Sequence, residues 1–173
     1  MSEPIHPDVR IGHAQLRVAD LERATAFYRD GLGFEVMDMG AQAAFLSAGG
    51  YHHHIGLNTW HSAGGTPPPP GHTGLFNIAI LYPDRRELAK AVKHVLDHGY
   101  DFTFAHQTPA GEAVYLNEPD GNGLELYYDL PREQWPTDEE GSPLFDGDLF
   151  GKLDPESAQF LLGNRNDCFN FAL

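Results

Sequence analysis

The sequence has a single cysteine, Cys168, and only 11 lysine and arginine residues against 25 aspartate and glutamate residues in a chain of 173. One cysteine excludes an internal disulfide framework and is typical of the reducing cytoplasm. The formal net charge of −14 argues against non-specific binding to nucleic acid or to an anionic membrane. No apolar run has the length of a membrane span, and the first ten residues lack the hydrophobic stretch of a secretory signal. Small-molecule or metal chemistry is therefore the expected class of function.

A repeat is the most informative pattern in the chain. Residues 12–36 and 76–102 both show a short alternating strand, an aspartate, an amphipathic helix, a glycine and another strand. Two further strand-like runs follow each copy, at 44–47 and 51–60 in the first and at 113–117 and 124–129 in the second. We therefore predict an α+β fold in which paired βαβββ modules form a curved mixed sheet with the helices on the outside.

The predicted organisation is one domain followed by an extension. Four consecutive prolines between the copies favour an extended, semi-rigid connector. The end of the chain is acidic at first and then more apolar; we expect it to pack on the domain or on a partner subunit, with a short helix at 156–162. The predicted boundaries are 1–135 for the domain, about 9–60 for the first module, 61–74 for the connector, about 75–129 for the second module and 136–173 for the extension.

Both predicted helices have local start and stop signals. Asp20 and Asp84 stand where N-caps belong, and Glu87, three residues after Asp84, completes a capping-box pattern. Gly33 and Gly99 follow the last periodic residues, as is typical at helix ends. The apolar stripe of the second helix is predicted to be core and consists of Leu88, Ala91, Val92, Val95 and Leu96.

Alignment of the two copies by their caps places His13 at the same position as Asn77 on the first strand of each module. On the fourth strands, the apolar residues are expected to face the helices, so that His54 and Glu125 face the cleft, with His54 as the counterpart of Glu125. We predict that these four residues converge. Two imidazoles and one carboxylate suit a divalent metal, and with open positions they suit non-haem Fe(II). Alternatively, a strand histidine is simply a hydrogen-bonded polar residue, and residues 52–54 form a solvated edge.

A more specific pattern lies between His106 and Glu125. It consists of a histidine, an apolar residue followed by tyrosine, an acidic residue, a proline, a glycine and a glutamate, and it resembles the signature of the extradiol dioxygenases in the vicinal oxygen chelate superfamily. The resemblance covers about residues 9–135, and the runs YHHHIGLNTW and LPREQWP are also similar to the catechol dioxygenase-like subgroup. The positions that carry the pattern are His106, Val114, Tyr115, Glu118, Pro119, Gly121 and Glu125.

The resemblance implies roles for individual residues. Glu125 would be the metal carboxylate and His13 the first-strand histidine ligand, while the second-strand ligand position carries Asn77, where this sequence departs from the family pattern. His54 would complete the set, because glyoxalase-like members use the fourth strands of both copies. Tyr115 and His106 would be the catalytic residues, Tyr115 as a hydrogen-bond donor to a substrate oxygen and His106 as an acid or base.

The leading hypothesis from the sequence is a metal-dependent extradiol-type ring-cleaving dioxygenase that acts on a small catecholic aromatic and dioxygen. Fe(II) is the expected metal, with Mn, Ni and Zn as alternatives, and the resemblance implies a homodimer. A glyoxalase-like metal-dependent isomerase or lyase is a second hypothesis, opposed by the absence of a second carboxylate among the four predicted ligands. A metal-free small-molecule binding or resistance protein is a third, and Asn77 favours it.

Overall fold

The computed structural model describes residues 3–144 and 151–152. The chain divides into two compact units, with the boundary between Thr66 and Pro67. This boundary falls inside the segment 61–74 that the sequence marks as the connector. Each unit is described below by itself. None of the helices in the described part of the chain has both the length and the apolar character of a membrane span.

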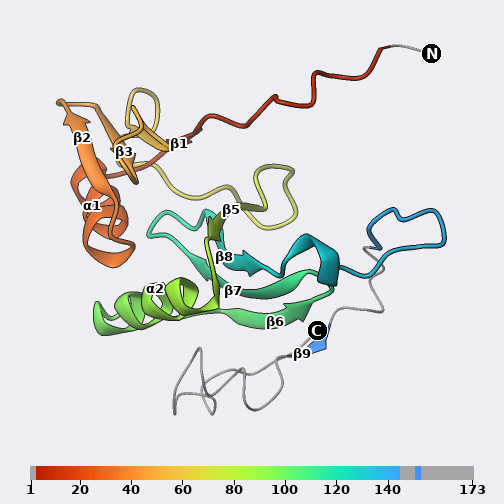
Figure 1. The fold of residues 1–173 in the computed structure, drawn as a ribbon. Coiled ribbons are helices and arrows are strands. Elements are labelled where there is room, and N and C mark those ends of the chain that lie inside the picture. Colours follow the sequence, from red (N-terminus) through yellow and green to blue (C-terminus); the bar gives the residue numbers. More distant parts are fainter. Residues whose placement is uncertain (1–2, 145–150, 153–173) are drawn as a thin grey trace. The chain divides into compact units, whose positions relative to one another are not determined.

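The first unit is one βαβββ module (Figure 1). Its four-stranded sheet has the order β1-β4-β3-β2. Strands β1 and β4 are parallel, whereas the β3–β4 and β2–β3 pairs are antiparallel. The elements are β1 (Ala14–Arg17), α1 (Leu21–Ala26), a π-helical turn η1 (Phe27–Gly31), β2 (Glu35–Met39), β3 (Ala43–Ser47) and β4 (Ile55–Asn58).

The second unit repeats this topology, which confirms the predicted duplication. Its sheet has the order β5-β8-β7-β6-β9, and β5 and β8 are parallel as β1 and β4 are in the first unit. The β7–β8 and β6–β7 pairs are antiparallel. The elements are β5 (Asn77–Tyr82), α2 (Arg85–Asp97), β6 (Phe104–Thr108), β7 (Gly111–Asn117), β8 (Gly123–Asp129), the 3-10 turn η2 (Arg132–Gln134) and β9 (Gly151–Lys152).

Local capping sets where both helices begin. The Asp20 carboxylate accepts the backbone N–H of Arg23 at 3.0 Å, and Asp84 accepts that of Glu87 at 2.9 Å. These bonds satisfy donors that a helix leaves without an internal partner, and each contributes about 1 kcal/mol. The side chain of Glu87 is bonded to Lys90. The capping box therefore shows the aspartate half of its expected pattern.

Each sheet packs an apolar face against its own helix. In the second unit α2 contacts β5 and β8, and its buried residues follow the predicted stripe. Fully burying a valine or leucine side chain stabilises the fold by about 1.5–3 kcal/mol, so the contact between helix and sheet is a main source of stability in each unit. Buried positions include Leu16, Val18, Phe27, Tyr28, Leu46, Ile55 and Leu57 in the first unit and Leu88, Val92, Val95, Val114, Leu116, Leu124 and Leu126 in the second.

The described part of the extension forms a turn of its own and a short strand that joins the second sheet. An isolated bridge joins Thr137 to Pro143, and the Asp138 carboxylate accepts the backbone N–H groups of Glu140 and Ser142 inside that turn. Strand β9 pairs antiparallel with β6. This added strand is not part of the predicted module. The helix predicted at 156–162 and the cysteine at 168 lie outside the described residues.

Candidate active site

Alternation along the second sheet separates the face that α2 covers from the opposite face. Leu124 and Leu126 of β8 are fully buried, so Glu125 between them points to the face opposite α2. Tyr115 on β7 is the Cα partner of Glu125, and Phe104 on β6 is the partner of Tyr115. The three side chains therefore form one row across the sheet.

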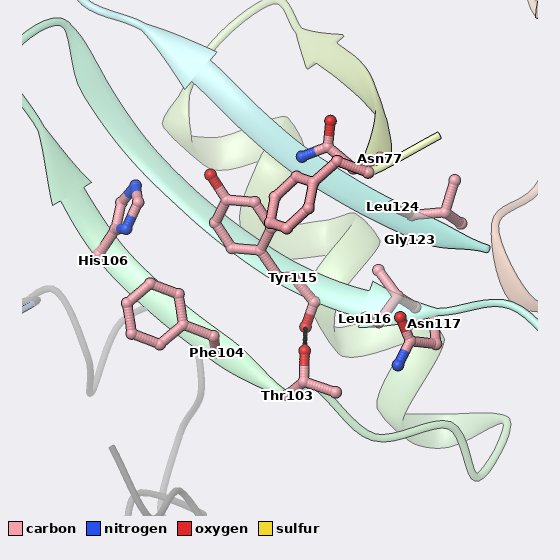
Figure 2. Close-up of a pocket in the computed structure, with 10 residues that line it drawn as sticks. Asn77, Thr103, Phe104, His106, Tyr115, Leu116, Asn117, Gly123 and Leu124 are labelled. Atoms are coloured by element: carbon pink, nitrogen blue, oxygen red, sulfur yellow. Dashed lines mark hydrogen bonds between the residues drawn. The ribbon is translucent and has the colours of Figure 1, made fainter. Parts of the chain in front are cut away.

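A pocket of about 480 Å³ lies on this face of the second sheet (Figure 2). Three rings form much of its wall. The centroid distances are 5.1 Å from Phe104 to His106, 5.3 Å from His106 to Tyr115 and 5.8 Å from Phe104 to Tyr115. Phe76 and Asn77 border the pocket from the start of β5. A largely aromatic wall with a few polar groups is typical of a small-molecule site.

The polar groups beside this wall converge on Glu125. The Asn77 Nδ2 donates a hydrogen bond to the Glu125 Oε2 at 3.0 Å. The Tyr115 side chain is hydrogen-bonded to the same carboxylate, and a phenol and an ionised carboxylate can bond only with the phenol as donor. Figure 2 shows the Asn77 amide and the Tyr115 ring on the same side of the sheet. One carboxylate thus accepts from two neighbours that line the pocket.

Burial and the Glu125 charge set the protonation of the neighbouring side chains. Burial raises the pKa of Tyr115 well above its usual range, and the hydrogen bond to Glu125 and the Glu125 charge add to this effect. The phenol therefore stays protonated and serves as a donor. Burial lowers the pKa of His106, against an opposing effect of the Glu125 charge, so this imidazole is neutral near pH 7 and can accept a proton.

The charge of Glu125 also affects two side chains further along β8. Burial is the largest cause of the raised pKa of Tyr127 and of Asp129, and the negative charge of Glu125 contributes to both. Tyr127 and Asp129 alternate with buried positions on β8, as Glu125 does, and so lie on the same face. This face therefore carries a carboxylate pair, Glu125 and Asp129, that favours bound cations or protonated partners.

A buried carboxylate organises the turn that leads into β8. The Oε1 of Glu118 accepts the backbone N–H groups of Asp120 and Asn122 at 3.0 and 2.9 Å, and the Asn122 side-chain amide at 2.8 Å. Gly121 in this turn has a φ of 84°, a conformation that favours glycine. The acidic residue and the glycine of the signature therefore have a structural role: they fix the turn from which Glu125 projects.

In the first unit, the predicted histidines lie just before strands rather than within them. The residue after His13 donates its backbone N–H to the His54 carbonyl at 2.9 Å, so the two histidines stand at the starts of neighbouring strands. The His13 ring is 4.3 Å from the His53 ring. The His54 Nδ1 lies 3.2 Å from the Ser47 Oγ and 3.3 Å from the Ala48 backbone N–H that donates to it. His54 is thus bonded to the end of β3.

The strand registers correct the alignment of the fourth strands. Ala14 pairs with Ile55 in the first unit, and Ile78, at the same distance from its cap, pairs with Leu124 in the second. The counterpart of Glu125 is therefore Gly56, and the prediction that it is His54 is wrong. The Gln15 side chain occupies the space beside Gly56, and its amide would have to move to admit a side chain there.

The second unit therefore brings together four of the predicted residues: Asn77, His106, Tyr115 and Glu125. Among residues 3–144 and 151–152, no group of three or more His, Cys, Asp or Glu side chains is arranged to hold a metal ion. Phe104 also lines the pocket and was not among the residues predicted for the site. Its signal was present, because Phe104 precedes His106 by two residues and alternation places both on one face.

Comparisons with known proteins agree with this geometry. The chain is 41% identical over 139 residues to "Catechol-2,3-dioxygenase" of Bacillus subtilis (strain 168), an alignment that covers 80% of this chain and 48% of that protein. It is 27% identical over 141 residues to "Biphenyl-2,3-diol 1,2-dioxygenase 3" of Rhodococcus globerulus, with 82% and 72% covered. A solved glyoxalase/dioxygenase from Nostoc punctiforme has the same fold, with a TM-score of 0.60, 19% identity, and 76% of this chain and 99% of that chain covered.

Residues 10–126 match the glyoxalase/bleomycin resistance protein/dioxygenase superfamily. The chain belongs to this superfamily. The resemblance inferred from the run between His106 and Glu125 is therefore confirmed at the level of the superfamily. The chain spans about half the length of the Bacillus subtilis relative, and superfamily members differ in the reaction that the shared fold supports.

Proposed function

We propose that the protein is a metal-dependent extradiol-type dioxygenase that cleaves the ring of a small catecholic aromatic. The convergence of Glu125, Tyr115 and His106 on one face of the second sheet, beside a pocket with aromatic walls, carries the proposal. The 41% identity to a catechol-2,3-dioxygenase supports it, with the activity taken from that relative as a proposal for this chain. The pocket supports this substrate class, because its rings offer stacking surfaces for an aromatic and its polar groups can bond to the oxygens of a diol.

The donor set of the second unit fits a divalent metal in part. Glu125 supplies a carboxylate oxygen. Asn77 supplies an amide whose nitrogen now donates to Glu125, and it would have to turn its oxygen toward an ion to become a ligand. We propose that Glu125 and His13 hold the metal, with Asn77 and His54 as the weaker candidates. Fe(II) is the metal we propose first, and Mn, Ni and Zn are the alternatives.

When bound, such an ion would supply Lewis acidity and hold the diol beside dioxygen. The residues of this chain then have separate tasks. The hydroxyl of Tyr115, kept protonated by its raised pKa, would turn from Glu125 and donate its hydrogen bond to a substrate oxygen. The neutral imidazole of His106 accepts the proton that the diol loses and can return it later. Phe104 packs against both rings and limits the access of water.

The hydrogen bond between Asn77 and Glu125 also favours a second candidate function, a metal-free binding or resistance protein. In that case the carboxylate and the amide would bind a hydroxylated ligand directly. The glyoxalase-like alternative is less well supported, because Gly56 stands at the position equivalent to Glu125 and offers no second carboxylate.

Metal analysis and oxygen uptake separate these functions. The purified protein would be assayed for iron, manganese, nickel and zinc, loaded anaerobically with Fe(II), and supplied with a panel of catechols and labelled dioxygen. We expect bound metal, oxygen uptake and both oxygen atoms in a ring-opened product. Tyr115→Phe should retain the metal while kcat/KM falls by about 10²-fold. Metal without oxygen uptake would point to an isomerase, and no metal under any loading would point to the binding protein.

Location and assembly belong to the same proposal. One cysteine in 173 residues is compatible with the cytoplasm, and the strongly negative charge opposes association with nucleic acid. The family resemblance suggests a homodimer. Sedimentation of the intact chain, with and without Fe(II), would measure the oligomeric state directly.

A further inference from the structure

Two histidines lie together at the end of α2, on a helix that packs against the other face of the sheet from the pocket. His94 and His98 are four residues apart, which places them on the same side of the helix, and both are exposed. Their ring centroids are 4.2 Å apart, with 47° between the ring planes. Neither residue lines the pocket. The spacing is that of two imidazoles that can bind one ion from a single helical turn.

A hydrogen bond fixes the orientation of the second imidazole. The His98 Nδ1 lies 2.8 Å from the backbone carbonyl of His94. A carbonyl oxygen only accepts, so Nδ1 must carry the proton, and the lone pair of the neutral ring is then on Nε2. Histidine ligands of metals commonly show this arrangement, with the second ring nitrogen donating to a backbone carbonyl. His98 is thus held in the tautomer that a metal ligand requires.

The surrounding charge favours a cation at this position. The pair lies at the C-terminal end of α2, where the helix dipole is negative. Asp97, between the two histidines, forms an ion pair with Lys93, so the nearest lysine is already engaged with a carboxylate. The chain as a whole carries a formal charge of −14. These features lower the electrostatic cost of bringing a divalent ion to two neutral imidazoles.

We propose that His94 and His98 form a two-imidazole site for a borderline divalent cation such as Cu²⁺, Ni²⁺ or Zn²⁺. Imidazole nitrogen is a preferred donor for these ions, and Cu²⁺ should bind more tightly than Ni²⁺ or Zn²⁺. In the described part of the chain, no third His, Cys, Asp or Glu completes the pair, so water fills the remaining positions. The site is separate from Glu125 and does not depend on the proposed dioxygenase activity.

Copper and zinc titrations of the full-length, chelator-treated protein test this site. His94→Gln and His98→Gln should each weaken Cu²⁺ binding at one site by at least about tenfold. The control is His72→Gln, which removes another exposed imidazole, in the connector, and should bind as the wild type does. Circular dichroism without metal checks that each variant is folded. Unchanged Cu²⁺ affinity in both helix variants would overturn the proposal.

Two spectroscopic measurements locate the bound ion. Both are made in Glu125→Gln, which removes the carboxylate of the proposed active-site metal and so separates this site from the pocket. The electron paramagnetic resonance spectrum of the one-copper complex should show coupling to two nitrogens, and amide resonances broadened by Cu²⁺ should centre on the last turn of α2. Broadening centred on residues 13 and 52–54 instead, where the chain has its other group of imidazoles, would contradict the assignment.

Discussion

The carboxylate of Glu125 acts on four titratable side chains around it. Its charge raises the pKa of Tyr115, Tyr127 and Asp129, and it opposes the lowering of the pKa of His106. A group with this many electrostatic partners on one face of a sheet, two of which line the pocket, is a strong candidate for the functional centre. Changes to the groups that touch Glu125 should therefore alter ligand binding more than the stability of the fold.

Replacement of the amide beside Glu125 tests its part in metal binding. Asn77→His should lower the dissociation constant for Fe(II) by at least about tenfold, because an imidazole is a better ligand than a neutral amide. Anaerobic titration with a competing chelator gives the constant. Asn117→His is the matched control, since Asn117 lines the same pocket, whereas the amide that donates to Glu125 is that of Asn77. Equal affinity in the two variants would remove Asn77 from the proposed ligands.

The lowered pKa of His106 predicts where activity is lost in acid. A base works in its neutral form, so kcat/KM should be at its maximum above the pKa of His106 and fall as the pH drops through it. Because that pKa lies below the ordinary 6.5, the midpoint of the fall should lie below pH 6.5 and should disappear in His106→Gln. Metal content measured at each pH excludes metal loss as the cause. A midpoint at or above pH 6.5 would contradict the assignment.

At the scale of single residues, signals between near neighbours in the sequence predicted the structure correctly. Signals that depend on pairing between distant strands did not. Asp20 and Asp84 were identified as caps because a cap bonds to a residue three positions away. Alternation also placed Glu125 on the correct face. It could not show that Gly56 rather than His54 is its counterpart, because a shift of two residues keeps the face and changes the partner. Register depends on pairing between strands distant in sequence.

Among the elements, α2 and β7 are joined by a buried ion pair. Arg85, in the first turn of α2, donates to both carboxylate oxygens of Glu112, at 2.8 and 3.0 Å, and the Glu112 side chain is 5% exposed. Burial and the charge of Glu112 also raise the pKa of Tyr128 on the neighbouring strand. This contact could not be predicted from the sequence, because its partners are 27 residues apart and a glutamate on a strand is expected to face solvent.

Breaking this pair should cost more than breaking a surface pair. Glu112→Gln should lower the free energy of unfolding by about 2 kcal/mol, less than for a fully buried pair because the Arg85 side chain is 32% exposed. Lys90→Ala, which removes a surface pair with Glu87, should cost about 0.5 kcal/mol or less. Urea unfolding followed by circular dichroism measures both. Similar losses in the two variants would mean that burial adds nothing to the pair.

For the whole molecule, the repeat made the fold predictable, because each copy carries its own periodicity, caps and glycines. The strand order of both sheets follows from that repeat. Strand β9 was not predicted, since two residues carry no periodicity and their pairing depends on the free edge of β6. The chemistry of the pocket was recognised from a run of twenty residues, 106–125. This was possible because β6, β7 and β8 follow one another in the sequence and pair antiparallel, so residues close in the sequence are also close in the sheet.

The proposed function also makes a prediction about the whole chain, that the two residues which the family resemblance implies as ligands, His13 and Glu125, are each needed for metal retention. His13→Ala and Glu125→Ala should each reduce Fe(II) retained after gel filtration to near background, because either change removes a ligand. His6→Ala, at an exposed position, should retain the wild-type amount. Plasma mass spectrometry gives the metal content. Full retention in His13→Ala would show that the ion does not need that imidazole.

The glycine at position 56 has a consequence for the choice of substrate. Under the proposed function, a divalent ion held by Glu125 and neutral side chains keeps one net positive charge, which a singly deprotonated diol would cancel. A second carboxylate ligand would make the complex neutral before any substrate arrived, and the attraction for an anionic ring would be lost. Under the proposed function, the glycine at the position equivalent to Glu125 would thus leave the metal with a preference for phenolate ligands over uncharged ones.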